Sequence, residues 1–94
     1  MKYKVEFTAA FKKDYKLAVK RGLDINILKY VINTLMTGQT LEKKYKDHSL
    51  VNSRIYENVR ECHIKPDWLL IYKIDKDVLI LKLIRTGTHS DLFN

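Results

Sequence analysis

The sequence predicts an α+β fold: an N-terminal strand, a two-helix hairpin, and then a three-stranded antiparallel meander, with the helices covering one face of a single sheet. Three observations predict this order. Apolar residues first alternate with charged ones, then recur at helical spacing through two stretches, and finally return to strand-like runs separated by very short turns. A chain of 94 residues suffices for one domain, so we expect residues 1–94 to form a single unit.

The first strand and the first helix are defined by a change of period. Apolar and charged side chains alternate over residues 3–7, which is typical of a half-buried strand. From residue 9 to residue 21 the apolar residues share one helical face, and lysines occupy the others. Thr8 is a suitable N-cap for this helix, and Gly22 suits the left-handed residue that ends it.

The second helix begins after Asp24, its expected N-cap, and ends at Gly38. Its apolar stripe consists of Leu28, Val31, Ile32 and Leu35. The short gap between the helices predicts an αα-hairpin. The lysine-rich residues 39–52 then read as a long irregular connection, which is a place where function often lies.

The rest of the chain is predicted to be β-structure. Strands are expected over residues 55–64, 68–74 and 78–85, with Pro66 and Asp67 forming the first tight turn. Both connections are too short for parallel crossovers, so the three strands form an antiparallel meander.

A two-residue turn would place Lys65 opposite Trp68 and His63 opposite Leu70. One face of the meander would then be polar and open, carrying Glu61, His63, Lys65, Trp68, Leu70 and Tyr72. The other face would be core-like, carrying Cys62, Ile64, Leu69 and Ile71. A slip of one residue would exchange these two faces.

Composition excludes several classes of protein. A single cysteine excludes an internal disulfide, and no segment has the roughly 18 apolar residues needed to span a bilayer, so we expect a cytoplasmic protein without membrane association. The formal net charge of +7 points to a polyanionic or acidic partner, with plain solubility as the alternative.

Three histidines lie in the polar parts of the second half: His48, His63 and His89. Two histidines in different protonation states can act as general base and general acid near neutral pH. Asp67 lies across the turn from His63, and an arginine such as Arg85 can stabilise charge on a phosphate. The plain alternative is that these are solvated surface side chains.

Other chemistries find little support. Trp68 and Phe93 are aromatic platforms on which a base can stack, although a tryptophan at a strand start is often a core residue. Cys62 and His63 are adjacent in a strand and point to opposite faces, and no pair of ligands has zinc-like spacing. No glycine-rich phosphate loop is present. We therefore expect neither a metal nor a cofactor.

Three long segments resemble the YafQ family of toxins, in the RelE/ParE superfamily of type II toxin–antitoxin systems. They read D-H-S-L at 47–50, R-E-C-H-I-K-P-D-W-L-L-I-Y at 60–72 and R-T-G-T-H-S-D-L-F at 85–93. The predicted N-terminal strand and helical hairpin also fit this RelE-like fold, so the resemblance covers almost the whole chain.

The resemblance implies an enzyme: a ribosome-dependent mRNA endoribonuclease, or mRNA interferase, that cuts translated message in the A site and inhibits translation and growth. It implies metal-independent acid–base catalysis with attack by the 2′-OH. The family's catalytic positions fall on His48, His63, Asp67 and His89. Its phosphate-binding or RNA-binding positions fall on Arg85, Trp68, Phe93 and Glu61.

The resemblance also implies partners. These are the ribosome with its mRNA, and a cognate DinJ/RelB-like antitoxin that is itself dimeric; operator DNA would be bound only through the antitoxin complex. The free toxin is expected to be a monomer. Two alternatives stay open: a ParE-like gyrase poison of the same fold, which would lack this histidine set, and a non-catalytic member that binds only antitoxin and operator.

Overall fold

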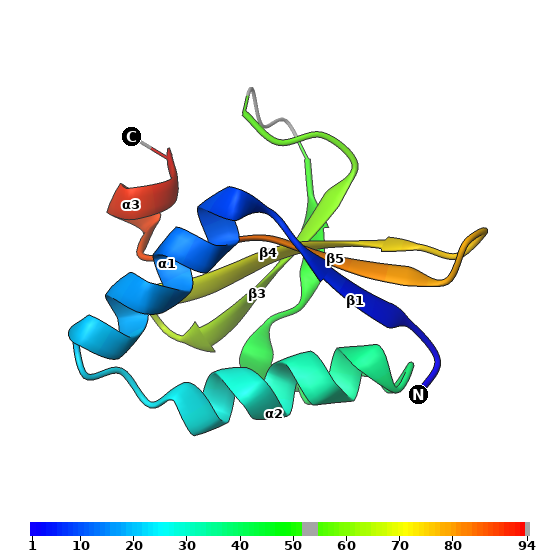
Figure 1. The fold of residues 1–94 in the computed structure, drawn as a ribbon, viewed down its shortest axis with the longest axis horizontal. Coiled ribbons are helices and arrows are strands. Elements are labelled where there is room, and N and C mark those ends of the chain that lie inside the picture. Colours follow the sequence, from blue (N-terminus) through cyan, green and yellow to red (C-terminus); the bar gives the residue numbers. More distant parts are fainter. Residues whose placement is uncertain (52–54, 94) are drawn as a thin grey trace.

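The structure is a computed structural model that describes residues 1–51 and 55–93 (Figure 1). In chain order its helices and strands are β1 (Lys4–Phe7), α1 (Ala9–Lys20), α2 (Ile25–Met36), the 3₁₀-helix η1 (Lys43–Tyr45), β2 (His48–Leu50), β3 (Val59–Lys65), β4 (Trp68–Asp75), β5 (Ile80–Gly87) and α3 (His89–Phe93). This α+β order agrees with the sequence pattern.

The strands form one five-stranded sheet in the order β1-β5-β4-β3-β2. Strands β3, β4 and β5 make the expected antiparallel meander. The sheet is nevertheless larger than a three-stranded meander and is mixed, because β1 pairs in parallel with β5 at one edge and β2 pairs antiparallel with β3 at the other. The crossover from β1 to β5 therefore spans nearly the whole chain.

The ends of both long helices are as predicted. The Thr8 side chain accepts a hydrogen bond from the backbone N–H of Phe11, and Asp24 accepts one from Asn26. Gly22 and Gly38 follow the two helices with φ of +74° and +81°, the left-handed conformation that favours glycine. These local signals suffice to set the hairpin.

The long connection before the meander is not wholly irregular, contrary to expectation. It contains η1 and the short strand β2, so His48 lies in the sheet. A polar strand of three residues leaves no periodic signal that would predict it. The last residue of the expected connection, Asn52, lies outside the described residues. Strand β3 begins four residues later than expected, and β5 begins two residues later.

An irregularity between His63 and Lys65 corrects the predicted faces. Lys65 pairs with Trp68 as expected, but His63 pairs with Leu69 and Cys62 pairs with Leu70. One extra residue in a strand exchanges the faces of everything beyond it. As a result Trp68, Leu70 and Tyr72 pack with Cys62 and Ile64 in the helix-covered core, and Leu69 and Ile71 lie on the opposite face.

That opposite face is partly closed by the C-terminal segment. A second, smaller cluster of buried side chains forms there from Tyr56, Val59, Leu69, Ile71 and Leu92. Leu92 of α3 thus packs against Leu69 and Ile71 on the face opposite α2, and α3 lies beside β5. None of the helices in the described part of the chain is long and apolar enough to cross a membrane.

Cys62→Ala is expected to lower stability and to preserve activity. Cys62 is completely buried among the helix-facing side chains, and burial raises the pKa of its thiol, which keeps it protonated and unreactive. Losing the sulfur should cost about 1–2 kcal/mol. Thermal unfolding followed by circular dichroism measures the loss, and an unchanged melting temperature would contradict this placement.

Candidate active site

Three histidines from separate parts of the chain meet on the face opposite α1 and α2. His48 comes from β2, His63 from β3 and His89 from α3. The ring centroids of His48 and His63 are 6.3 Å apart, and those of His63 and His89 are 5.9 Å apart. The structure therefore brings together the histidines that the sequence singled out.

A buried carboxylate lies between the first two rings. Glu61 pairs with His48 across β2 and β3, and its side chain is only 7% exposed. Its Oε1 is 3.7 Å from His48 Nε2 and 3.3 Å from His63 Nε2. The family resemblance placed Glu61 among the residues that contact RNA. In the structure its carboxylate is buried and lies next to His48 and His63.

Each of these rings is oriented through its other nitrogen. Nδ1–H of His48 donates to the backbone carbonyl of Lys46 at 2.7 Å, and Nδ1–H of His63 donates to that of Pro66 at 3.2 Å. A carbonyl oxygen only accepts, so Nδ1 carries the hydrogen in both rings. The Nε2 atoms are then the ones close to Glu61, whose negative charge favours either ring when it is protonated, although neither contact is a hydrogen bond in the structure.

His89 is paired with Asp67, the carboxylate that the sequence placed across the turn from His63. Asp67 Oδ1 accepts from His89 Nδ1–H at 2.7 Å and from the His89 backbone N–H at 3.0 Å. These hydrogen bonds, the backbone one first, lower the pKa of the Asp67 carboxyl. With Nδ1–H donated to the carboxylate, Nε2 of His89 presents a lone pair toward the site.

The docking of His89 on Asp67 should be lost in acid. Because the pKa of Asp67 is lowered in the folded protein, this contact is fully present above the ordinary aspartate pKa of about 4 and disappears as pH falls through the lowered value. The His89 amide resonance in NMR spectra should therefore shift below about pH 4 and follow the Asp67 titration. An identical shift in Asp67→Asn would contradict this coupling.

Helix α3, which carries His89, is held by hydrogen bonds in its first turn and by an ion pair to the end of α1. Thr88 and Asp91 cap it reciprocally, each side chain accepting the other residue's backbone N–H at 3.0 Å. Arg21 at the end of α1 contacts Asp91 at 2.7 Å and lowers the pKa of its carboxyl. Gly87 precedes the helix, where a Cβ would lie 3.0 Å from the Asp91 side chain. The tail is thus anchored to α1.

Phe93 closes one side of the histidine cluster. Its ring lies 6.3 Å from that of His89 and makes a T-shaped contact with Tyr56 at 5.6 Å. The Tyr56 hydroxyl donates to the Leu92 carbonyl at 3.0 Å, which holds this last turn against the sheet. The half-buried Phe93 ring therefore borders the site.

Arg85 lies on the same face but apart from the histidines. It pairs with Ile71, which in turn pairs with Glu61, so two strand spacings, roughly 10 Å, separate Arg85 from Glu61. Its guanidinium makes two bonds to Asp14 of α1, 2.6 Å from Nε and 3.0 Å from Nη2. Asp14 also accepts the backbone N–H of Thr86. Arg85 thus ties α1 to the sheet.

Trp68 is not on the face with the histidines, so the expectation that it lies there is wrong. Its side chain is buried in the core under the helices, and its Nε1–H donates to the Thr86 hydroxyl at 2.9 Å. That hydroxyl donates to the Leu69 carbonyl at 2.6 Å. An indole packed in this way cannot stack on a base.

Sequence reasoning missed a polar network that supports His48. The hydroxyl of the buried Tyr72 donates to Asp47 Oδ1, and Arg60 Nη2 donates to Asp47 Oδ2 at 3.1 Å. Burial and the neighbouring carboxylate raise the pKa of the Tyr72 phenol, which keeps it a donor. The only signal in the sequence is Asp47 itself, the first residue of D-H-S-L, next to His48.

The side chains of the site do not form a metal cage. Among residues 1–51 and 55–93, no three histidine, cysteine, aspartate or glutamate side chains are placed to hold a metal ion together. Their nitrogen and oxygen atoms instead bond to one another or to backbone carbonyls, an arrangement that suits proton transfer.

Comparison with known proteins finds the same family that the sequence motifs indicated. The family described as "Bacterial toxin of type II toxin-antitoxin system, YafQ" matches residues 3–94. The mRNA interferase toxin YafQ of Escherichia coli K12 is 46% identical over 92 residues, 95% of this chain and 94% of that protein. The chain resembles the crystal structure of the E. coli DinJ–YafQ complex with a TM-score of 0.87 and 42% identity, covering 98% of this chain and 99% of that one. It resembles a metal-bound toxin from Helicobacter pylori with a TM-score of 0.89 and 45% identity, covering 97% and 99%.

Proposed function

This chain belongs to the YafQ family of bacterial type II toxins, and we propose that it is an mRNA interferase that cuts message on translating ribosomes and so stops translation and growth. The observation that carries this proposal is the cluster of His48, His63 and His89 with its two carboxylates. An E. coli relative of 46% identity bears the name of that activity.

RNA cleavage needs no external nucleophile, because the neighbouring 2′-OH attacks the phosphorus. A base removes the 2′-OH proton, positive charge stabilises the crowded phosphorane, and an acid protonates the departing 5′-oxygen. The products are a 2′,3′-cyclic phosphate, or the 3′-phosphate formed by its hydrolysis, and a 5′-OH. Imidazole groups at the spacing found here are suited to both proton transfers.

The hydrogen bonds favour one division of roles. His89, with Nδ1–H held by Asp67, offers Nε2 as the general base, and Asp67 then stabilises the imidazolium that forms. Protonated His63, oriented through Nδ1–H by the Pro66 carbonyl and favoured by the nearby charge of Glu61, serves as the acid and gives its Nε2 proton to the 5′-oxygen. His48 shares Glu61 and adds a second donor to the phosphorane oxygens. Glu61 thus acts on the RNA through the histidines.

The remaining contacts to RNA are proposed for Phe93 and Arg85. The Phe93 ring borders His89, where a base flanking the cleaved bond can stack on it. Arg85 contributes positive charge from the same face, although Asp14 holds two of its nitrogens. The net charge of +7 supports a salt-sensitive contact with ribosomal RNA.

We further propose that a DinJ-like antitoxin silences this chain and carries it to operator DNA. A protein of 42% identity was crystallised as a DinJ–YafQ complex. The basic charge offers an acidic, folding-on-binding segment of the antitoxin a complementary surface. The free toxin is proposed to be a monomer, which sedimentation at micromolar concentration tests.

The proposal is tested by primer extension on an mRNA translated in a purified system. Wild-type protein should produce new 5′-OH ends within the reading frame, and message without ribosomes should stay intact. If the protein arrests growth in cells but produces no cuts in translated mRNA, the nuclease assignment is refuted. Inhibition of gyrase by the same preparation would replace it with the ParE-like alternative.

Removing transition metals should leave cleavage unchanged. The side chains at the site are arranged for proton transfer, and within the described residues no three of them share a metal position. The chelator 1,10-phenanthroline removes zinc and copper but leaves the Mg²⁺ that ribosomes need. Equal cleavage rates with and without it are expected. Loss of activity that returns on adding zinc or copper would contradict metal-independent catalysis.

A further inference from the structure

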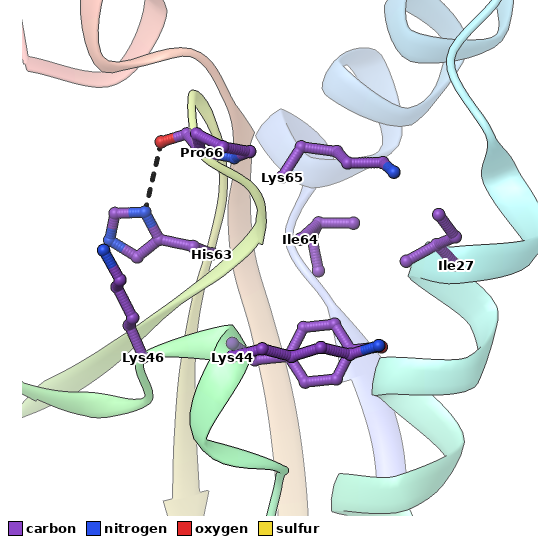
Figure 2. Close-up of a pocket in the computed structure, with 8 residues that line it drawn as sticks. Ile27, Lys44, Lys46, His63, Ile64, Lys65 and Pro66 are labelled. Atoms are coloured by element: carbon purple, nitrogen blue, oxygen red, sulfur yellow. Dashed lines mark hydrogen bonds between the residues drawn. The ribbon is translucent and has the colours of Figure 1, made fainter.

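A groove of about 310 Å³ opens beside His63, between η1, α2 and the turn that joins β3 to β4 (Figure 2). Its apolar side is formed by Ile27 of α2 and Ile64 of β3. Around these lie Lys44, Lys46 and Lys65. We call this feature the lysine groove. His63 and Pro66 form its end nearest to the histidine cluster.

The three lysines carry unbalanced positive charge. No carboxylate in the described part of the chain lies within 4.0 Å of any of their ammonium groups. The Lys44 ammonium lies 5.2 Å over the ring of the buried Tyr45. In Figure 2 the ammonium groups of Lys44 and Lys65 lie toward α2 and that of Lys46 lies at the His63 ring, so a strand with successive phosphates along the groove gains from all three charges.

Lys46 links the groove directly to the site. Its backbone has φ of +48°, a left-handed conformation that non-glycine residues rarely adopt and that often accompanies a functional position. From there its carbonyl accepts Nδ1–H of His48, and its side chain extends toward the His63 ring in Figure 2. One residue therefore orients a histidine and contributes charge to the groove.

We propose that the lysine groove binds the nucleotide that flanks the cleaved bond, with its phosphates on the three lysines and its ribose against Ile27 and Ile64. This inference rests on the proposed nuclease function and names a substrate subsite for it. Single-stranded RNA offers both chemistries that the groove presents, a repeating anion and an apolar sugar or base face. The groove also begins at His63, so a strand held there is continuous with the scissile phosphate.

The test uses a short RNA whose 2′-hydroxyls are all methylated, because it cannot be cleaved and so reports binding alone. Its affinity for the full chain is measured by fluorescence anisotropy over a range of salt concentrations. The variant combines Lys44→Gln, Lys46→Gln and Lys65→Gln. The matched control removes the same charge outside the groove, at the exposed Lys13, Lys20 and Lys73. Circular dichroism melts confirm that both are folded.

The groove variant should bind this RNA roughly 10-fold or more weakly at ~0.1 M salt, with a salt-dependence slope smaller by about 2. The control should retain most of its affinity. NMR shifts on adding the RNA to wild-type protein should include the methyl groups of Ile27 and Ile64. Equal losses in the two variants, or unshifted isoleucine methyls, would overturn the proposal.

Cleavage of translated mRNA separates this inference from the nuclease proposal. If the groove variant cleaves at the wild-type rate and binds RNA as tightly as wild type, the proposed nucleotide subsite is refuted and the nuclease proposal stands. If the wild-type protein does not cleave, but the groove variant binds RNA more weakly than wild type, the nuclease proposal is refuted and the groove remains an RNA-binding site. Weakened antitoxin binding with unchanged RNA binding would reassign the groove to the protein partner and overturn the proposal.

Discussion

His89→Ala is expected to lower the rate of mRNA cleavage by roughly 10²- to 10⁴-fold, the usual contribution of one general acid or base. His89 holds Nδ1–H on Asp67 and presents Nε2 to the site, so no neighbouring group can take over its proton transfer from the same position. The His89 side chain is 55% exposed, so the melting temperature should hardly change. Single-turnover cleavage on stalled ribosomes measures the effect.

Asp67→Asn tests the carboxylate that orients His89, and it is compared directly with His89→Ala. It keeps the shape of the side chain but removes the charge that orients His89 and stabilises its imidazolium, so its cleavage rate should fall less than that of His89→Ala. His63→Ala should be as severe as His89→Ala. If His63→Ala and His89→Ala both cleave at the wild-type rate with equal amounts of folded protein, neither histidine carries the chemistry.

The position of Asp67 just beyond the end of β3, close to His63, was predictable because its signal is local. A tight turn at Pro66 places Asp67 beyond the end of β3, and Gly87 permits the chain to leave β5 toward α3. The caps at Thr8 and Asp24 likewise need only a few neighbouring residues. Such short-range signals act without knowledge of the rest of the fold.

The faces of β4 were not predictable, because they depend on one irregular step between His63 and Lys65. Turn residues restrict the loop but do not reveal an extra residue in the strand before it. The parallel pairing of β1 with β5 and the addition of β2 join residues far apart in sequence, for which periodicity carries no signal. The predicted face was therefore wrong for residues of β4 such as Trp68, because the register between β3 and β4 decides which face of the sheet they occupy.

The polar contacts of the site could not be predicted from the sequence either, because they join residues that are far apart in the chain. Glu61 and His63 alternate correctly on one face of β3, but the burial of Glu61 under two histidines depends on β2 pairing beside it. The bond between Arg85 and Asp14 joins residues 71 positions apart. Residue type indicated that each can serve a phosphate or a histidine, and only the tertiary structure decides which partner it has.

Trp68→Ala is expected to destabilise the protein by about 3–5 kcal/mol. The indole is 4% exposed in the core under the helices, and its removal also leaves the Thr86 hydroxyl without its donor. Domains of this size are commonly stable by only about 5–15 kcal/mol, so this loss takes a large part of the total. Urea unfolding followed by far-UV circular dichroism measures it. Toxicity in cells should then fall through loss of folded protein.

Trp68→Phe separates this structural role from a contact with RNA. It fills most of the cavity and loses the hydrogen bond to Thr86, so it should cost about 1–3 kcal/mol and leave the folded fraction with the wild-type cleavage rate. A Trp68→Phe protein as stable as wild type but unable to cleave would place the indole against the RNA, and the register between β3 and β4 would then have to change. A stability loss with cleavage intact assigns Trp68 to the core that holds β4 and β5 together beneath the histidines.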